Sequence, residues 1–581
     1  MTTINYKIYI SQVLALVVVC IMSSCDFLDK EPTLTTSGNY FKNTTEAESF
    51  LKGVYAILTQ TSYYANEYYY LVGGDDTEHY GGSGRAPYSK GLICNNANTS
   101  DADVAGFWYT LYAGINRANI FIENIDNVPD MAEQQLAQLK AEARFLRAFY
   151  YFNLVECWGD VPFTTSSTQT VNGLAIERTD KEVIYDFIEK EMSESAEDLP
   201  NAADLDYQPG RASRSTAWGI LARVLMFRAG EHFRDHQSAD ASKVQELFTR
   251  ADQYAQRVMD EGHSLAPHYW DYFIDLCSNK YNTTGRESIW EAEFAGNYTT
   301  DTRTEGRVGN IIGISAPDES SNANIVGSAD PGYGYGFFYC TPKLFDLYEA
   351  NGDIQRMNWN IAPFQYTESV AGKGVDGRLF EVGKLAEVKQ QYYSKSFFYG
   401  DTKVGDNKGD REKATANVDK SRVCGKYRRE YESDKKNKNY TSINFPILRY
   451  ADVMLMVAEC ENETNAQPTS LAYQCINEVR SRAGIEPLTS LTKEEFRQAV
   501  KDERAMELCF ECTRRFDLIR WGEYVSSMNA LVNRALEGTD WKLGPTNVYT
   551  YFQISDTYLY FPIPANEIAV NSKITQNNPG W

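Results

Sequence analysis

Apolar residues recur at intervals of three or four along the N-terminal half of the chain, the spacing of helices with one buried face. The clearest run covers 133–157 and ends before Trp158-Gly159-Asp160-Val161-Pro162, a glycine stop followed by a proline. Further amphipathic stretches cover 179–198, 213–230 and 243–261, and Phe50 to Leu58 form a shorter one. Successive helices without intervening strands predict an antiparallel helical-repeat scaffold.

The middle of the chain, 263–445, lacks this regular spacing and is rich in Gly, Asn and Tyr. A strand-like piece covers 288–294. The helical pattern returns over 449–463, 470–483, 493–512 and 514–525. Near the end, prolines make Tyr560–Pro564 an extended segment. We therefore expect a mainly α fold with long loops and a few short strands.

The N-terminus predicts an exported lipoprotein. A polar start containing Lys7 precedes a short apolar run, Val13–Met22, and the small residues Ser23 and Ser24 lead to Cys25. The run is too short for a membrane span but fits a secretory signal covering 1–24. Cys25 occupies the place of the acylated cysteine in a bacterial lipobox, and 25–45 reads as an acidic tether. The alternative is an ordinary signal peptide with an incidental cysteine.

Charge and composition restrict the kinds of ligand that the chain is expected to bind. The net charge of −22 argues against nucleic acid and anionic membrane surfaces as ligands. The chain contains 40 tyrosines, whose flat apolar face and polar tip suit contacts with carbohydrate or peptide. We expect most of them to pack in the helical core.

Candidate metal and catalytic groups are sparse. Cys509-x-x-Cys512 lacks a second such pair, and His232 and His236 lack a third ligand, so we predict no metal site. A structural cation near the loops is possible in principle, but no EF-hand spacing supports it. Glu503, Glu507 and Glu511 follow one helical face among arginines, which should hold them ionised and paired. Neither a nucleophile elbow nor a phosphate loop is present, so no enzyme activity and no cofactor are predicted.

Taken in order, a set of motifs from end to end resembles the SusD/RagB family, surface lipoproteins that partner TonB-dependent transporters in Bacteroidetes. The segments that carry the resemblance are Cys25–Asp29, Ala141–Phe152, Gly159–Pro162, Gly210–Arg214 with Leu221–Arg223, Arg449–Val453 with Ala458-Glu459, Asn477–Gly484, Glu503–Arg520, Phe561–Pro564 with Glu567-Ile568, and Gln576–Gly580. Cys512 departs from the pattern, because the family commonly has glycine there.

The resemblance implies a TPR-like helical scaffold with an N-terminal region at 46–262 and a C-terminal region at 263–581. It also implies a binding protein, anchored by lipid on the outer face of the outer membrane, with a SusC-like TonB-dependent transporter as partner. The implied ligand is an oligosaccharide or polysaccharide. A peptide-binding, RagB-like module is the alternative, and a secreted glycoside hydrolase is a weaker one.

The ligand site is expected in the glycine- and tyrosine-rich loops, because family members bind glycans on exposed aromatic rings beside carboxylates and amides. Ordinary loop packing remains the alternative for each residue. Trp108 and Trp290 lie in apolar patterns and are assigned to the core. The ligand-binding candidates are Asp76, His79, Tyr80 and Tyr88 in the loop-like segment 61–106, and Tyr298, Tyr333 and Tyr335 in the middle region.

Overall fold

The architecture comes from a computed structural model. It describes residues 40–81, 91–168, 175–205, 207–236, 240–294, 306–314, 325–326, 334–362, 364–368, 394–399, 402–406, 420, 422–432, 436–437, 439–538, 541 and 545–581. The predicted signal, Cys25, and most of the tether therefore lie outside the described residues. No helix in the described part is long and apolar enough to cross a membrane.

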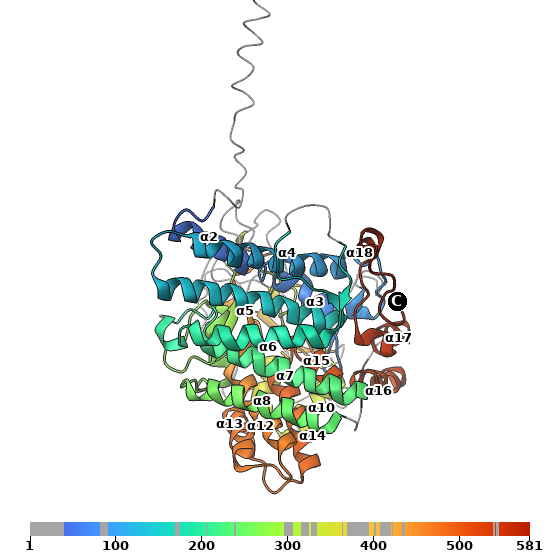
Figure 1. Cartoon of the computed structure of the whole chain (residues 1–581). Coiled ribbons are helices and arrows are strands. Elements are labelled where there is room, and N and C mark those ends of the chain that lie inside the picture. The colour runs from blue at the N-terminus through green and yellow to red at the C-terminus, as the bar shows by residue number, and fades with distance from the viewer. Residues whose placement is uncertain are drawn as a thin grey trace, which may run out of the picture.

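Neighbouring helices pack in a stack, which Figure 1 shows running from the end near α2 down to α13 and α14. Each helix in this stack packs against the one before it, and this confirms the predicted helical-repeat scaffold. In the order of the stack, the helices are α2 (Thr44–Tyr55), α4 (Ala102–Asn124), α5 (Glu133–Trp158), α6 (Lys181–Asp198), α7 (Arg214–His236), α8 (Ala241–Asp260), α12 (Tyr450–Thr464), α13 (Ser470–Ala483) and α14 (Lys493–Leu508).

The predicted helices begin at residues whose side chains cap them. The Asp101 carboxylate accepts hydrogen bonds from the N–H groups of Asp103 and Val104 at the start of α4, and Asp180 plays the same part for α6. At α14, Thr492 and Glu495 form a reciprocal capping box. These caps satisfy backbone donors that the first helical turn would otherwise leave without partners.

Two predicted helices end earlier than their apolar pattern suggests. The stretch 493–512 leaves the helix at Leu508, because Phe510 and Cys512 adopt left-handed backbone angles, with φ of 61° and 60°. Glycine adopts such an angle without steric cost, whereas Cys512 adopts it with a side chain. The stretch 514–525 is broken at Gly522, with φ of 70°, into α15 (Arg514–Arg520) and α16 (Tyr524–Glu537).

The remaining helices surround the stack. Contrary to the predicted loop over 61–106, this stretch contains α3 and a π-helical turn. The rings of Tyr64 and Tyr68 are buried against Phe445, and the buried Tyr63 ring stacks on Tyr64. Burial of these large rings stabilises helical turns that the local sequence does not favour. Besides α15 and α16, the helices outside the stack are α3 (Glu67–Val72), α9 (Tyr269–Cys277), α10 (Pro342–Asn351), α11 (Ile354–Asn360), α17 (Pro545–Phe552) and α18 (Ala565–Val570).

The strands are short and pair antiparallel. The predicted strand at 288–294 is confirmed as β4, which pairs with β11 from much later in the chain. The pairs are β1 (Glu78–Tyr80) with β6 (Phe338–Cys340), β2 (Val161–Pro162) with β3 (Arg178–Thr179), β4 (Ser288–Ala292) with β11 (Phe445–Arg449), and β5 (Ile325–Val326) with β10 (Lys436–Asn437). In addition, β7 (Phe364–Glu368), β8 (Ser394–Tyr399) and β9 (Thr402–Asp406) form one sheet.

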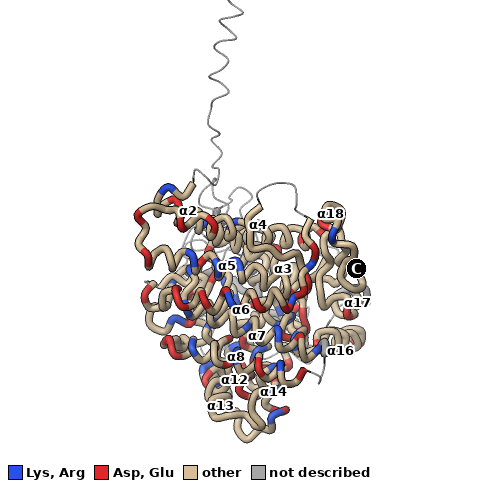
Figure 2. The backbone as a smooth tube through the Cα atoms, viewed as in Figure 1, with Lys and Arg blue, Asp and Glu red and all other residues tan. Residues whose placement is uncertain are grey.

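The core is aromatic, and it contains both tryptophans assigned to it. The rings of Trp108 and Trp290 are fully buried, and Trp290 packs edge-on against Phe149. Outside the core, acidic and basic residues are interspersed along the stacked helices, as Figure 2 shows.

Candidate functional site

Asp76, a predicted ligand-binding residue, is buried in an ion-pair cluster. Its carboxylate accepts a hydrogen bond from Arg514 Nε at 2.8 Å and also pairs with Lys343. Burial alone would raise the pKa of Asp76, but the charges of Arg514 and Lys343 prevail and hold it at about 2. Two cations from distant segments already pair with the carboxylate, so this burial does not favour the ligand-binding role of Asp76, which stays a prediction.

His79 and Tyr80 are also buried, since they belong to β1 and not to a loop. The His79 ring packs against Trp541 and Phe552, and its burial lowers its pKa to about 4. The Tyr80 ring is fully buried beside Phe338. Successive side chains of a strand point to opposite faces, and other side chains cover both faces of β1, so the structure does not offer His79 and Tyr80 to a ligand.

Tyr335 remains partly exposed. Its ring stacks on Phe337 with the centroids 4.7 Å apart, and the guanidinium of Arg307 lies 5.7 Å from the Tyr335 centroid. The N–H of Tyr335 donates to the carbonyl of Asn310 at 2.7 Å, and Arg307 donates to the side chain of Asn310 at 2.9 Å. The ring is therefore fixed in position while one part of it stays accessible.

The pairing of β1 with β6 brings the two predicted loop regions to one place. The strands run antiparallel with Tyr80 opposite Phe338, and the N–H of Gly81 donates to the carbonyl of Phe337 at 2.8 Å. The chain that leads to Tyr88 leaves the sheet at this end, and the chain that follows Tyr333 enters it here. Tyr88, Tyr298 and Tyr333 themselves lie outside the described residues.

We call this place the Tyr335 edge, defined by Gly81, Arg307, Asn310, Tyr335 and Phe337. Sequence reasoning found Tyr335 but missed Arg307 and Asn310. The sequence around Arg307 and Asn310 indicates a site only weakly, because an arginine and an asparagine in an irregular segment have many possible roles. The nearby glycines, Gly306 and Gly309, were the only local hint of a close turn.

The predicted pairing of Glu503, Glu507 and Glu511 with cations is confirmed, although α14 ends before Glu511, so only Glu503 and Glu507 share its face. Glu503 pairs with Arg480. Glu507 contacts Arg356, Arg449 and Arg482, and the oxygens of Glu511 contact Arg449 and Lys426. All of these side chains are buried. Carboxylates held in this way cannot approach a glycosidic bond, so the arrangement does not favour the glycoside hydrolase alternative.

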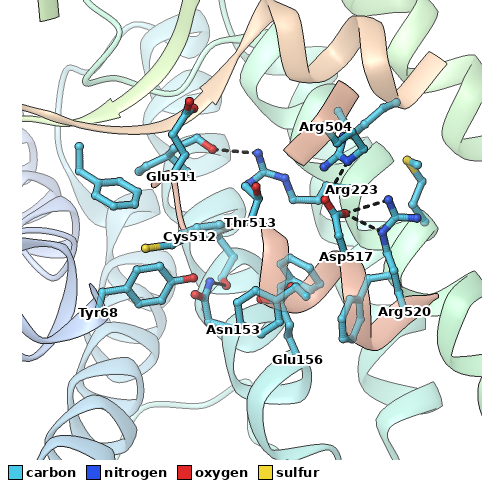
Figure 3. Close-up of a pocket in the computed structure, with 18 of the residues that line it drawn as sticks. Tyr68, Asn153, Glu156, Arg223, Arg504, Glu511, Cys512, Thr513, Asp517 and Arg520 are labelled. Atoms are coloured by element: carbon cyan, nitrogen blue, oxygen red, sulfur yellow. Dashed lines mark hydrogen bonds and ion pairs between the residues drawn. The ribbon is translucent and has the colours of Figure 1, made fainter. Parts of the chain in front are cut away.

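A small polar cavity lies between α5, α7 and the loop after α14, and Figure 3 shows Arg504 and Arg520 converging on Asp517 beside it. Its volume of about 50 Å³ is far below the roughly 300–1,000 Å³ of typical ligand pockets. Glu156 faces it, and burial raises the pKa of Glu156 well above its usual range. The cavity therefore belongs to the interior and not to a ligand site.

Of the candidate metal ligands named from the sequence, the side chains of Cys509, Cys512 and His232 are among those described, and that of His236 is not. Cys509 and Cys512 are buried thiols outside any disulfide, and His232 contacts Asp240 and Glu182. The described residues include no group of three or more metal-binding side chains.

The fold and the Tyr335 edge define a class of protein: a helical-repeat scaffold that presents an aromatic edge beside short strands. The chain matches the model of the SusD family over residues 286–581, and a second model, described as starch-binding and associating with the outer membrane, over residues 26–226. The chain belongs to the SusD family.

The similarity to curated relatives extends over most of this chain. SusD-like protein P25 of Formosa agariphila is 26% identical, with 96% of this chain and 95% of the relative covered. The starch-binding protein SusD of Bacteroides thetaiotaomicron is 23% identical, with 80% and 76% covered. Among solved structures, a SusD homologue from Bacteroides thetaiotaomicron has a TM-score of 0.77 at 25% identity, covering 94% of this chain and 98% of its own. A laminarin-binding SusD-like protein has a TM-score of 0.64 at 23% identity, covering 93% and 100%.

Proposed function

We propose that this protein binds an oligosaccharide or polysaccharide at the cell surface and delivers it to a SusC-like TonB-dependent transporter in the outer membrane. In this proposal Cys25 carries the lipid anchor and the chain is a binding protein, not an enzyme. The names of a starch-binding and a laminarin-binding relative support a glycan as the ligand.

The observation that carries the proposal is the Tyr335 edge. A partly exposed ring supports the C–H face of a sugar, and the guanidinium of Arg307 beside it can donate to sugar hydroxyls. The end of β1 lies beside the start of β6, and in the sequence Tyr88 follows β1 while Tyr333 precedes β6. We propose that they add to the same binding surface.

A binding screen of the mature protein tests this function. Calorimetric titration against starch, laminarin and other polysaccharides should show binding, whereas peptides of similar size should not bind. Tyr335→Ala should weaken glycan binding about 10-fold, because loss of a stacking ring removes on the order of 1.4 kcal/mol. Tyr549→Ala, at an exposed tyrosine of α17, is the matched control and should bind as the unaltered protein does.

Two results would count against the proposal. Peptide binding without glycan binding would favour the RagB-like alternative, and release of reducing sugar by the purified chain would make it an enzyme. Delivery is tested separately, by co-purification of the lipidated chain with a transporter from detergent-solubilised outer membranes.

A further inference from the structure

A groove of about 620 Å³ lies on the surface between α4 and α18, well away in sequence from the Tyr335 edge. Figure 1 shows α18 near α4, and the N–H of Ala565 donates to the carbonyl of Thr99 just before α4 at 2.7 Å. The volume falls within the range of small-molecule sites. The side chains used below come from α4, from the chain after β2, and from α18.

One wall of the groove is aromatic. Tyr109 is 43% exposed, although large apolar rings usually avoid solvent on a helix that packs into the core. Tyr112, one turn further along α4, is fixed by its hydroxyl, which donates to the carbonyl of Pro162 at 2.8 Å. The buried ring of Trp108 lies behind it, with the Trp108 and Tyr112 centroids 5.0 Å apart. These contacts make the wall rigid. The Tyr109 ring projects from it with part of its surface accessible to solvent.

Polar side chains of the groove come from the next turn of α4 and from α18, and they have hydrogen-bonding groups without a partner among the described residues. Asn116 accepts from the N–H of Thr168 at 2.8 Å, which orients its amide, and its NH₂ has no partner among the described residues. Glu567 accepts from Asn571 at 3.2 Å through one oxygen, and no Lys or Arg of the described chain pairs with it. Tyr109 and Glu567 both line the groove, and burial together with the charge of Glu567 raises the pKa of the Tyr109 phenol.

The composition of the walls selects the ligand. Sugars are bound by stacking on an aromatic ring and by hydrogen bonds to their hydroxyls. The groove offers a solvent-accessible ring for stacking, and an oriented amide and an available carboxylate oxygen for the hydrogen bonds. None of the lining side chains is Lys or Arg, so the groove has no cation to receive an anionic group. An uncompensated carboxylate would repel a uronic acid or a phosphate.

We propose that this groove is a second glycan site, which takes a short segment of a neutral oligosaccharide. The proposal rests on the proposed function for its ligand class, but it shares no residue with the Tyr335 edge. Two separate contacts on one chain raise the apparent affinity for a long polymer, because the second contact forms at high effective concentration.

Titration with a short neutral oligosaccharide of the polymer that binds tests the groove. The unaltered protein should bind two molecules, and Tyr109→Ala or Asn116→Ala should bind one, with affinity for the long polymer about 10-fold or more lower. Tyr549→Ala is the control, and thermal unfolding checks that each variant is folded. Replacing the neutral oligosaccharide with a uronate-containing one should remove the second binding event, and Glu567→Gln should restore part of it.

The outcomes separate this inference from the proposed function. If the unaltered protein shows a single binding event that is lost in Tyr335→Ala and unchanged in Tyr109→Ala, the second site is wrong. The proposed function is then still supported. If binding is lost in Tyr109→Ala but unchanged in Tyr335→Ala, the groove is supported as a glycan site and the Tyr335 edge is excluded as one. Absence of any glycan binding overturns both.

Discussion

Glu507 shows how single side chains organise the interior. Burial by itself would raise its pKa, but Arg482, Arg449 and Arg356 surround the carboxylate and hold its pKa well below the usual range. The three arginines come from α13, β11 and α11, so one carboxylate links three elements. A buried charge with this many partners is costly to leave unmatched.

We predict that Glu507→Gln lowers the free energy of unfolding by about 3–5 kcal/mol, because three buried guanidinium groups lose their shared anion. Chemical denaturation at pH 7 measures this. Glu494→Gln, in the first turn of the same helix, is the control: its side chain is 78% exposed, and little change is expected.

The same variant has a pH signature. Since the folded pKa of Glu507 is depressed, its contribution is present above the unfolded value of about 4.3 and is lost as pH falls below it. The difference in stability between the unaltered protein and Glu507→Gln should therefore narrow in acid. A difference that stays constant down to pH 3 would show that the ion pairs do not carry the effect.

At the scale of elements, close contacts between helices depend on a few small residues. Gly230 in α7 faces the end of α15, and a Cβ at this position would collide with the carbonyl oxygen and Cβ of Arg520 and lie 2.7 Å from its Cα. Gly53 in α2, by contrast, has no atom within 4 Å of such a Cβ. The two glycines look alike in the sequence and differ only in what packs against them.

We predict opposite effects of alanine at these two positions. Gly230→Ala should lower the free energy of unfolding by about 1–3 kcal/mol, because a backbone cannot yield as a flexible side chain can. Gly53→Ala should leave stability unchanged or raise it by up to about 1 kcal/mol, since alanine favours helix. Parallel urea titrations measure both, and a gain in stability at Gly230→Ala would contradict the close packing of α7 on α15.

At the scale of the whole molecule, segments far apart in sequence complete each other's packing. Helix α12 lies against α8, and Arg223 of α7 joins Arg504 of α14 through Asp452. The charges of these two arginines hold the pKa of the buried Asp452 well below the usual range, even though desolvation opposes this. The predicted division at 262–263 stays a prediction, but its two sides share one core.

The C-terminus closes this arrangement. The buried amide of Asn578 donates to the carbonyls of Trp158 at 3.0 Å and Phe561 at 2.8 Å, and Trp158 Nε1 donates to the carbonyl of Pro562 at 2.9 Å. The last residues of the chain are thus fastened to the end of α5.

We predict that Asn578→Ala lowers the unfolding free energy by about 1–3 kcal/mol while the protein still unfolds in one transition, because two buried carbonyls lose their donor. Differential scanning calorimetry measures both quantities. Asn566→Ala, at an exposed asparagine of α18, is the control. Two separate transitions would show that the N-terminal and C-terminal parts unfold independently.

The sequence by itself determined the helical stack, the strand at 288–294, the burial of Trp108 and Trp290, and the pairing of the α14 acids with cations. These features follow from local periodicity, capping residues and the presence of arginines among the acids, all of which a short stretch of chain contains. The family motifs belong to the same category, because most of their residues shape helices and their caps.

Only the tertiary structure decided which tyrosines and acids face solvent. Asp76, His79 and Tyr80 follow a glycine pair that looks like a loop, yet pairing with β6 and contacts with Arg514 and Trp541 bury them. Tyr109 directly follows Trp108, which its apolar pattern assigns to the core, yet Tyr109 is exposed beside α18, which lies more than four hundred residues later in the chain. Exposure depends on which distant segment covers a side chain, and local sequence does not contain that information.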